Sequence, residues 1–159
     1  IIVQIIRPAT VCGFSPRMRF DISVNALVIN ALENKVIKVH GGSQLRPNIH
    51  IEDITDLYIY LIERESQIQG IFNAGFENLS ILEVAQMVSK VIPSTIKIEE
   101  STDPRSYRIN SDKLLATGFL PKYTVKDAIE ELSQIFIKGR LKNESQFNNL
   151  DWMLKHNYE

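Results

Sequence analysis

The chain opens on a short, nearly continuous run of Ile and Val, IIVQIIRP (residues 1–8). Apolar side chains at successive positions are typical of a strand buried on both faces of a parallel sheet. Such a strand needs neighbouring strands and covering helices, and no residues precede this one in the sequence. We therefore expect a carboxy-terminal piece of a longer protein. The alternative is a processed chain whose first strand lies in a self-sufficient sheet.

Segments with the apolar patterns of helices and strands alternate along the rest of the chain. The expected helices cover residues 22–34, about 52–65, 81–92, 110–117 and 124–136. The expected strands cover residues 35–40, 70–76 and 95–100, and residues 46–51 are expected to be extended because Arg46 precedes Pro47. This alternation indicates an α/β fold. Because the strands are few and short, we expect a small mixed subdomain plus one or two strands of a larger sheet.

Local capping signals define three of the expected helix starts. Ser80 with Glu83, and Thr124 with Asp127, have the spacing of capping boxes. Asp21 is positioned to cap the helix over residues 22–34.

The end of the chain is mostly polar. This divides the sequence into a main part, residues 1–139, and a polar tail, residues 140–159. The large apolar side chains expected to anchor part of the tail are Phe147, Leu150, Trp152 and Leu154.

Composition excludes several classes of function. The formal net charge is −1, so there is no electrostatic case for a nucleic acid or an anionic membrane as partner. Cys12 is the only cysteine and the three histidines are scattered, so we expect no metal site. A reducing, cytoplasmic setting fits the single cysteine. The seven glycines form neither a dinucleotide fingerprint nor a Walker loop, and we expect no catalytic residue in this chain.

One segment carries side chains that local structure does not explain. GGSQLRPNIHIEDITD (residues 41–56) combines a glycine turn with acids suited to a helix start. Arg46 and His50 have no place in a turn followed by a helix cap. They are therefore the first candidates for a binding role.

Five segments, in order, resemble the carboxy-terminal half of the extended short-chain dehydrogenase/reductase family. They are IIRPATVCG, SPRMRFDISVNALV, GGSQLRPNIHIEDITDLYI, IFNAGFENLSILEVAQMV and DPRSYRINSDKLLATGFLP. The family's NAD-dependent epimerases and dehydratases act on nucleotide-activated sugars. The resemblance implies a small mixed substrate-binding subdomain plus edge strands of a Rossmann-type sheet whose main part is missing. It also implies NAD or NADP as the cofactor of the parent protein, and a nucleotide-diphosphate sugar as its partner.

The resemblance also implies roles for particular residues. Arg46 matches the arginine that binds the diphosphate, for which a planar, permanently charged guanidinium is suited. Arg105 matches a second arginine at the same diphosphate, with an exposed turn residue as the alternative. Asn25 matches a substrate contact, and a purely structural role remains equally open. His50 matches the histidine of the same segment, with a hydrogen-bonded strand end as the alternative.

The other positions of interest either match the family near the end of a strand or depart from its pattern. Pro8 and Ala9 match backbone positions near the nicotinamide. Thr10 stands where a substrate-binding Asn is common, which leaves the identity of the sugar open. Asp53 also matches a family residue, and we interpret it as a helix cap.

The sequence thus predicts the nucleotide-sugar-binding part of an NAD(P)-dependent epimerase, dehydratase or reductase, inactive as an isolated fragment. We expect no tight NAD(P) binding by this chain, because the phosphate-cradling glycine turn is missing. The alternative is a non-catalytic interaction module that kept the fold.

Overall fold

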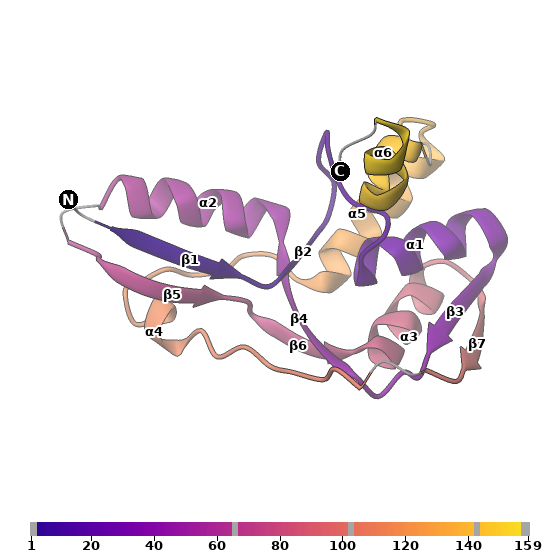
Figure 1. Ribbon diagram of the computed structural model, residues 1–159, viewed down its shortest axis with the longest axis horizontal. Helices are drawn as coiled ribbons and strands as arrows, with labels where there is room; N and C mark the ends of the chain where they lie inside the picture. Colours follow the sequence, from indigo (N-terminus) through magenta and orange to yellow (C-terminus); the bar gives the residue numbers. More distant parts are fainter. Residues whose placement is uncertain (1–2, 65–66, 102–103, 142–143, 157–159) are drawn as a thin grey trace.

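The computed structural model describes residues 3–64, 67–101, 104–141 and 144–156. Two groups of elements lie on either side of a short central sheet (Figure 1). In the first group, β1 (Gln4–Pro8) pairs in parallel with β5 (Gly70–Ala74). Helix α2 (Ile51–Ile62) runs beside this pair, and the short α4 (Asp112–Leu115) lies near β5. The predicted α/β class is confirmed.

The central sheet joins the two groups. Its order is β2 (Thr10–Cys12), β4 (Leu45–His50) and β6 (Glu77–Ser80). β2 pairs with β4 in parallel, whereas β6 runs antiparallel to β4. β2 follows β1 after one residue and β6 follows β5 after two, so the chain passes directly from the outer pair into the central sheet.

The second group contains the larger core. Helices α1 (Ser23–Asn34), α3 (Ile81–Val91) and α5 (Val125–Ile137) pack against one another and beside the parallel pair β3 (Val36–His40) and β7 (Thr95–Glu99). Buried aliphatic side chains from all three helices fill the space between them. This group packs against one side of the central sheet.

The outer pair is covered on one face only. On the face beside α2, Phe72 is buried and the amide of Gln4 donates to the carbonyls of Leu61 and Ile68. On the opposite face Ile5 and Ile71 are 44% and 42% exposed. The prediction that the first strand is buried on both faces is therefore wrong for this chain, because none of its described elements covers the second face.

Both predicted capping boxes are confirmed, at Ser80 with Glu83 and at Thr124 with Asp127. The predicted cap at Asp21 is wrong. Helix α1 begins after Ile22 without a side-chain cap, because the Asp21 carboxylate is engaged by the guanidinium of Arg19.

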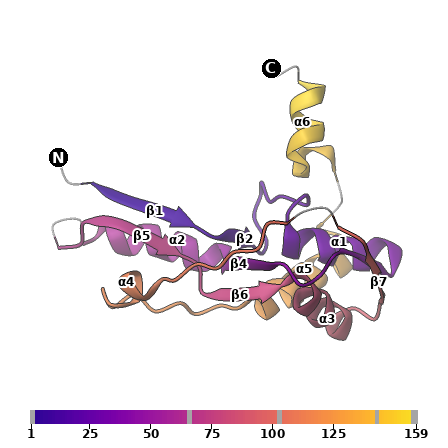
Figure 2. The ribbon, with the colours of Figure 1, turned by 60° about the horizontal axis from the view of Figure 1, so that its bottom comes forward.

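The carboxy-terminal part contains a 3-10 turn, η1 (Ser145–Phe147), and α6 (Asn149–Lys155). Phe147 is buried in the larger core, as predicted, and Trp152 is half-buried. Leu150 and Leu154 are 65% and 69% exposed, so their prediction as anchors is wrong. Figure 2 shows why: α6 stands out from the body of the molecule, and only its first turn lies near other elements.

Candidate functional site

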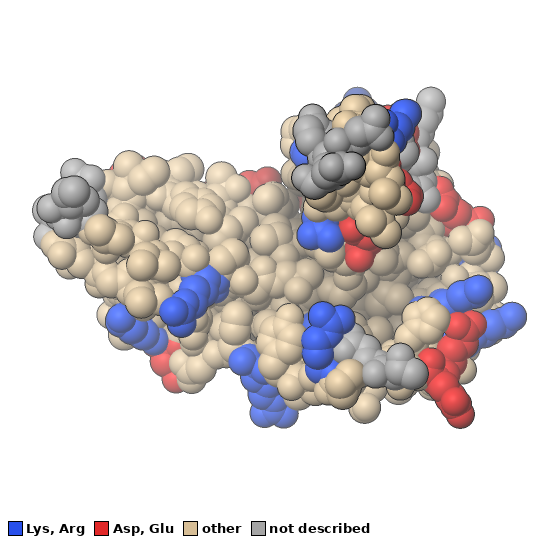
Figure 3. All heavy atoms as spheres, viewed as in Figure 1, with Lys and Arg blue, Asp and Glu red and all other residues tan. Residues whose placement is uncertain are grey.

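A cavity of about 710 Å³ opens between α1, β3, the start of β4 and the residues Ser101, Arg105 and Tyr107. Thr10, Arg19, Lys38, Arg46 and Arg105 all line it. In the space-filling view the middle of this face is hollowed, and Lys and Arg side chains lie on its border (Figure 3). The structure thus brings together three of the residues predicted for substrate binding.

Arg46 is held at the wall of the cavity by the chain around it. Its Nη1 donates to the carbonyl of Leu45 at 2.9 Å and to the carbonyl of Arg105, 59 positions away, at 2.5 Å. The guanidinium carbon lies 5.3 Å from the centroid of the Tyr107 ring, a cation–π distance. These contacts fix the plane of the guanidinium, which favours two-point binding of an anion.

Arg105 is exposed and comes to the cavity because its segment lies along the start of β4. The amide of Leu45 donates to the Ser106 hydroxyl at 3.0 Å, and the amide of Tyr107 donates back to the Leu45 carbonyl at 3.4 Å. The two candidate arginines therefore occupy one place in the fold, although they are far apart in the sequence.

The described side chains that line the cavity are predominantly positive. Among them Asp21 is the one carboxylate, and it accepts two hydrogen bonds from Arg19, at 2.8 and 2.9 Å. The hydrogen bonds from Arg19 lower the pKa of Asp21, and the same pair raises the pKa of Arg19. Lys38, Arg46 and Arg105 add positive charge to the lining of the cavity, which favours an anion.

The amino-terminal turn of α1 adds polar groups to the same wall. The hydroxyl of Ser23 is buried and finds no hydrogen-bond partner among the described residues. No acidic side chain lies in the first turn of α1, and no side chain caps it. The backbone amides of an uncapped helix start attract negative charge, so this wall also suits an anion.

Asn25 lies behind the wall rather than in it. Its side chain is 2% exposed, its Oδ1 accepts from the amide of Gly13 at 3.2 Å, and its Nδ2 donates to the carbonyl of Arg19 at 3.0 Å. Both ends of the amide are thus used to hold the loop between β2 and α1. These contacts favour the structural alternative for Asn25.

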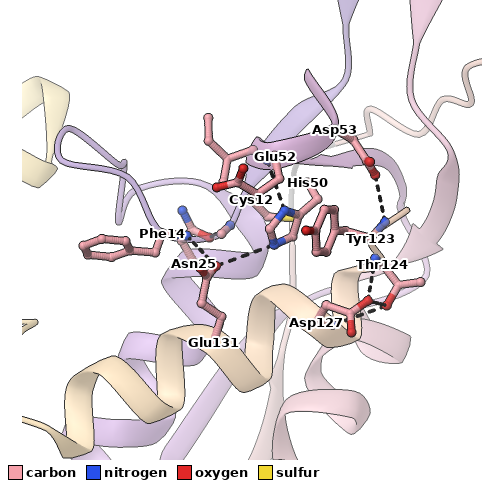
Figure 4. A network of polar contacts seen from close by, with 12 residues as sticks. Cys12, Phe14, Asn25, His50, Glu52, Asp53, Tyr123, Thr124, Asp127 and Glu131 are labelled. Atoms are coloured by element: carbon pink, nitrogen blue, oxygen red, sulfur yellow. Dashed lines mark hydrogen bonds and ion pairs between the residues drawn. The ribbon is translucent and has the colours of Figure 1, made fainter. Parts of the chain in front are cut away.

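His50 caps α2 and does not line the cavity. Its Nδ1 accepts from the amide of Glu52 at 3.2 Å, and Nε2 lies 3.6 Å from a carboxylate oxygen of Glu131 (Figure 4). Its ring stacks on Tyr123 with centroids 4.8 Å apart. A Cβ on residue 13 would lie 3.0 Å from Nε2, and Gly13 has φ +103°, so only glycine fits there without strain. The alternative of a hydrogen-bonded strand end therefore describes the observed contacts of His50.

Asp53 is structural, but it is not the helix cap that the sequence suggested. The cap of α2 is His50. Asp53 is fully buried and accepts hydrogen bonds from the amides of Lys122 at 2.8 Å and Tyr123 at 3.1 Å (Figure 4). It thereby fixes the chain that leads into α5.

Pro8 and Ala9 lie at the carboxyl end of β1, outside the cavity. The amide of Ala9 donates to the carbonyl of Ala74 at 2.7 Å. A Cβ on Gly75 would lie 2.6 Å from that of Ala9, so the two strands approach closely here. The carboxyl ends of parallel strands are where α/β folds bind their ligands.

Sequence reasoning missed Arg19, Lys38 and Ser23. Lys38 lies on the exposed side of the predicted strand 35–40, so the alternation of apolar and polar residues indicated only that its side chain faces solvent. Within the described ranges, no group of three His, Cys, Asp or Glu side chains is arranged to hold a metal ion. No helix in those ranges is long and apolar enough to cross a membrane.

Comparison with known proteins shows a similarity to one enzyme family. Residues 1–75 match the NAD dependent epimerase/dehydratase family. GDP-L-fucose synthase 1 of Arabidopsis thaliana is 26% identical over 116 residues, which are 70% of this chain and 35% of that protein. An anthocyanidin reductase of Vitis vinifera is 32% identical over 98 residues, 59% of this chain and 29% of that protein.

Solved structures give the same result. UDP-glucuronic acid 4-epimerase from Bacillus cereus, in complex with UDP-glucuronic acid and NAD, superposes with a TM-score of 0.71 at 25% identity. The match covers 87% of this chain and 46% of the epimerase. dTDP-glucose 4,6-dehydratase from Bacillus anthracis shares the fold, with a TM-score of 0.70 over 91% of this chain and 46% of that one. This chain therefore spans about half the length of these enzymes, and it is similar to the NAD-dependent epimerases/dehydratases of the extended short-chain dehydrogenase/reductase family.

Proposed function

We propose that this chain is the nucleotide-sugar-binding part of an NAD(P)-dependent sugar-nucleotide epimerase, dehydratase or reductase. The observation that carries the proposal is the basic cavity in which Arg46 and Arg105 meet. Arginine suits a diphosphate because its planar fork donates two parallel hydrogen bonds and is always charged.

Each wall of the cavity has a role in this proposal. Arg46 and Arg105 bind the diphosphate, and Lys38 adds positive charge beside them. Thr10, at the start of β2, faces the sugar with a hydroxyl that donates or accepts one hydrogen bond. Asn25 acts from behind the wall by holding the loop that precedes α1, and His50 caps α2 behind the same wall.

The cofactor contributes hydride exchange at a sugar carbon, and this chain supplies only one edge of its site. In this proposal Pro8 and Ala9, at the carboxyl end of β1, would contact the nicotinamide through their backbone. None of the chain's glycines forms the closely spaced set that cradles a pyrophosphate between a strand and a helix. The residues present therefore do not make a complete dinucleotide site, and the chain alone should bind NAD(P) weakly and carry out no turnover.

The uncovered face of the outer pair supports a larger assembly. Ile5 and Ile71 are exposed side by side in register, and parallel pairs normally have both faces covered. We infer that a covering α/β layer, belonging to the same longer protein or to a partner chain, completes the sheet and the cofactor site.

Calorimetric titration tests the proposal. We expect UDP-glucuronic acid, UDP and GDP to bind the chain, and the free sugar and uridine to bind far more weakly, because the diphosphate provides the charge-assisted contacts. NAD titrated under the same conditions should show no micromolar affinity. Binding of NAD but not of the diphosphates would overturn the proposal, and binding of neither would favour a non-catalytic interaction module.

A further inference from the structure

The carboxy-terminal segment (residues 144–156) is packed on the loop that forms one wall of the cavity. We call residues 13–21 the cavity loop. The amide of Phe20 donates to the carbonyl of Phe147 at 2.7 Å, and the two rings pack with their centroids 5.0 Å apart. Both side chains are buried, each 8% exposed. Figures 1 and 2 agree in placing the base of α6 beside this loop.

Polar contacts join the same two segments at a second place. The amide of Asn149 donates to Oδ2 of Asp21 at 3.3 Å, and Nη2 of Arg17 donates to Oδ1 of Asn149 at 3.1 Å. The guanidinium of Arg17 also lies 6.0 Å from the ring centroid of Trp152. The segment thus contacts the cavity loop with its 3-10 turn and with the first turn of α6.

These contacts bear directly on the cavity. Asp21 is the residue that orients Arg19 through two hydrogen bonds, and both side chains line the cavity. The cavity loop is also held at its start, where Glu131 accepts from the amide of Phe14 at 3.0 Å. The carboxy-terminal segment holds the other end, at Phe20 and Asp21, which is the end that lines the cavity.

From this arrangement we infer that the carboxy-terminal segment is a positioning element of the binding site, which keeps the cavity loop closed against the diphosphate. The inference rests on the proposed function, because it assigns the diphosphate to this cavity. Asn149 and Phe147 are its positioning residues. The side chain of Asn149 acts on the cavity loop through Arg17, and Phe147 acts through Phe20. Neither side chain touches the ligand.

Hydrogen exchange measured by mass spectrometry, together with calorimetry, tests the inference on the full chain. Asn149→Ala removes the acceptor of Arg17 while keeping the backbone amide that binds Asp21. Phe147→Ala removes the ring that packs on Phe20, and Phe147→Leu restores most of its apolar surface. Lys155→Ala, an exposed change in the last turn of the same helix, is the matched control.

We expect amides of residues 13–21 to exchange about two- to fivefold faster in Asn149→Ala, as for the loss of one exposed hydrogen bond. Phe147→Ala should have a larger effect, and Phe147→Leu should reverse most of it. The dissociation constants of UDP and GDP should rise by about the same factors, with the circular dichroism of the chain unchanged. Lys155→Ala should change neither quantity.

A wrong proposed function and a wrong role of the segment give different experimental results. If wild-type chain binds neither UDP nor GDP, the proposed function is wrong, and with it the role of the segment at a diphosphate site. If the wild type binds them but loop exchange in Phe147→Ala equals that of the control, the segment does not hold the loop and the inference is overturned. Faster exchange with unchanged affinity also overturns it, because the segment then has only a structural role.

Discussion

Replacing Arg46 with lysine should weaken nucleotide-diphosphate binding while the fold stays intact. Lysine keeps the charge but presents a single ammonium group in place of a planar fork. In the structure, Nη1 of Arg46 already donates to the carbonyls of Leu45 and Arg105, so the guanidinium plane is fixed at the cavity wall. An ammonium held by the same carbonyls cannot also make a two-point contact with a phosphate.

The expected loss is about 1–2 kcal/mol, close to the net value of one hydrogen bond to a charged group. This corresponds to a roughly five- to thirtyfold rise in the dissociation constant of UDP or UDP-glucuronic acid, measured by calorimetry. Arg108→Lys is the matched control, because Arg108 is exposed, lies three residues from Arg105 and does not line the cavity. An unchanged dissociation constant, or a fall in melting temperature that accounts for the loss, would show that Arg46 is structural.

Three further changes test the packing behind the site. Asp53→Asn should lower the free energy of unfolding by about 1–3 kcal/mol in urea titrations, since an amide carries one acceptor oxygen where the buried carboxylate accepts two backbone amides; an unchanged midpoint would contradict this role. Thr124→Ala should cost about 1 kcal/mol by the same assay, as the loss of the cap of α5, and a neutral result would refute the capping box as a source of stability. Burial raises the pKa of Glu77 above its usual 4.5. A raised pKa means that the folded state binds the proton more tightly, so this group's contribution to stability is present below pH 4.5 and declines as the pH rises through the folded pKa. The difference in unfolding free energy between wild type and Glu77→Gln should therefore change over that pH range, with the wild type becoming less stable relative to the variant as the pH rises. Parallel curves would contradict the raised pKa of Glu77.

Local signals explain why much of the fold was predictable. The capping boxes at Ser80 and Thr124 lie within four residues of their partners, so the sequence contains all the groups that form them. The extended conformation at Arg46 follows from steric contact with the next proline. Periodicity located α1, α2, α3 and α5 to within a few residues, because each buries one continuous apolar face.

Each of the wrong or missed predictions involves a partner that is distant in sequence, although Arg19, which also binds Asp21, is only two residues away. β6 (Glu77–Ser80) was not predicted, because only its pairing with β4 makes these four residues a strand. Asp21 looks like a cap until Arg19 and the amide of Asn149, 128 positions away, are seen to bind it. The first strand is half exposed for the same reason: a sequence shows that a strand is apolar, but not which of its faces meets another element.

The residues of the candidate site likewise divide into those that the sequence identified and those that only the fold brings to the cavity. Arg46, Arg105 and Thr10 were found through their resemblance to family segments, and the fold brings all three to one cavity. Arg19 and Lys38 belong to that cavity too, yet each lies in a segment whose local pattern is that of an ordinary loop or strand. Their shared position at the cavity can be recognised only when α1 and β3 are placed side by side.

The central claim is that the cavity between α1, β3 and β4 binds a nucleotide diphosphate. Titration of the isotopically labelled chain with UDP-glucuronic acid, followed by backbone amide resonances in NMR, tests it most directly. The largest shifts should fall on Thr10, the first turn of α1, Arg46 and residues 105–107. Shifts concentrated instead around Arg108 and Ser111, which line a separate cavity of about 550 Å³, would contradict the claim, as would the absence of any shift at millimolar ligand.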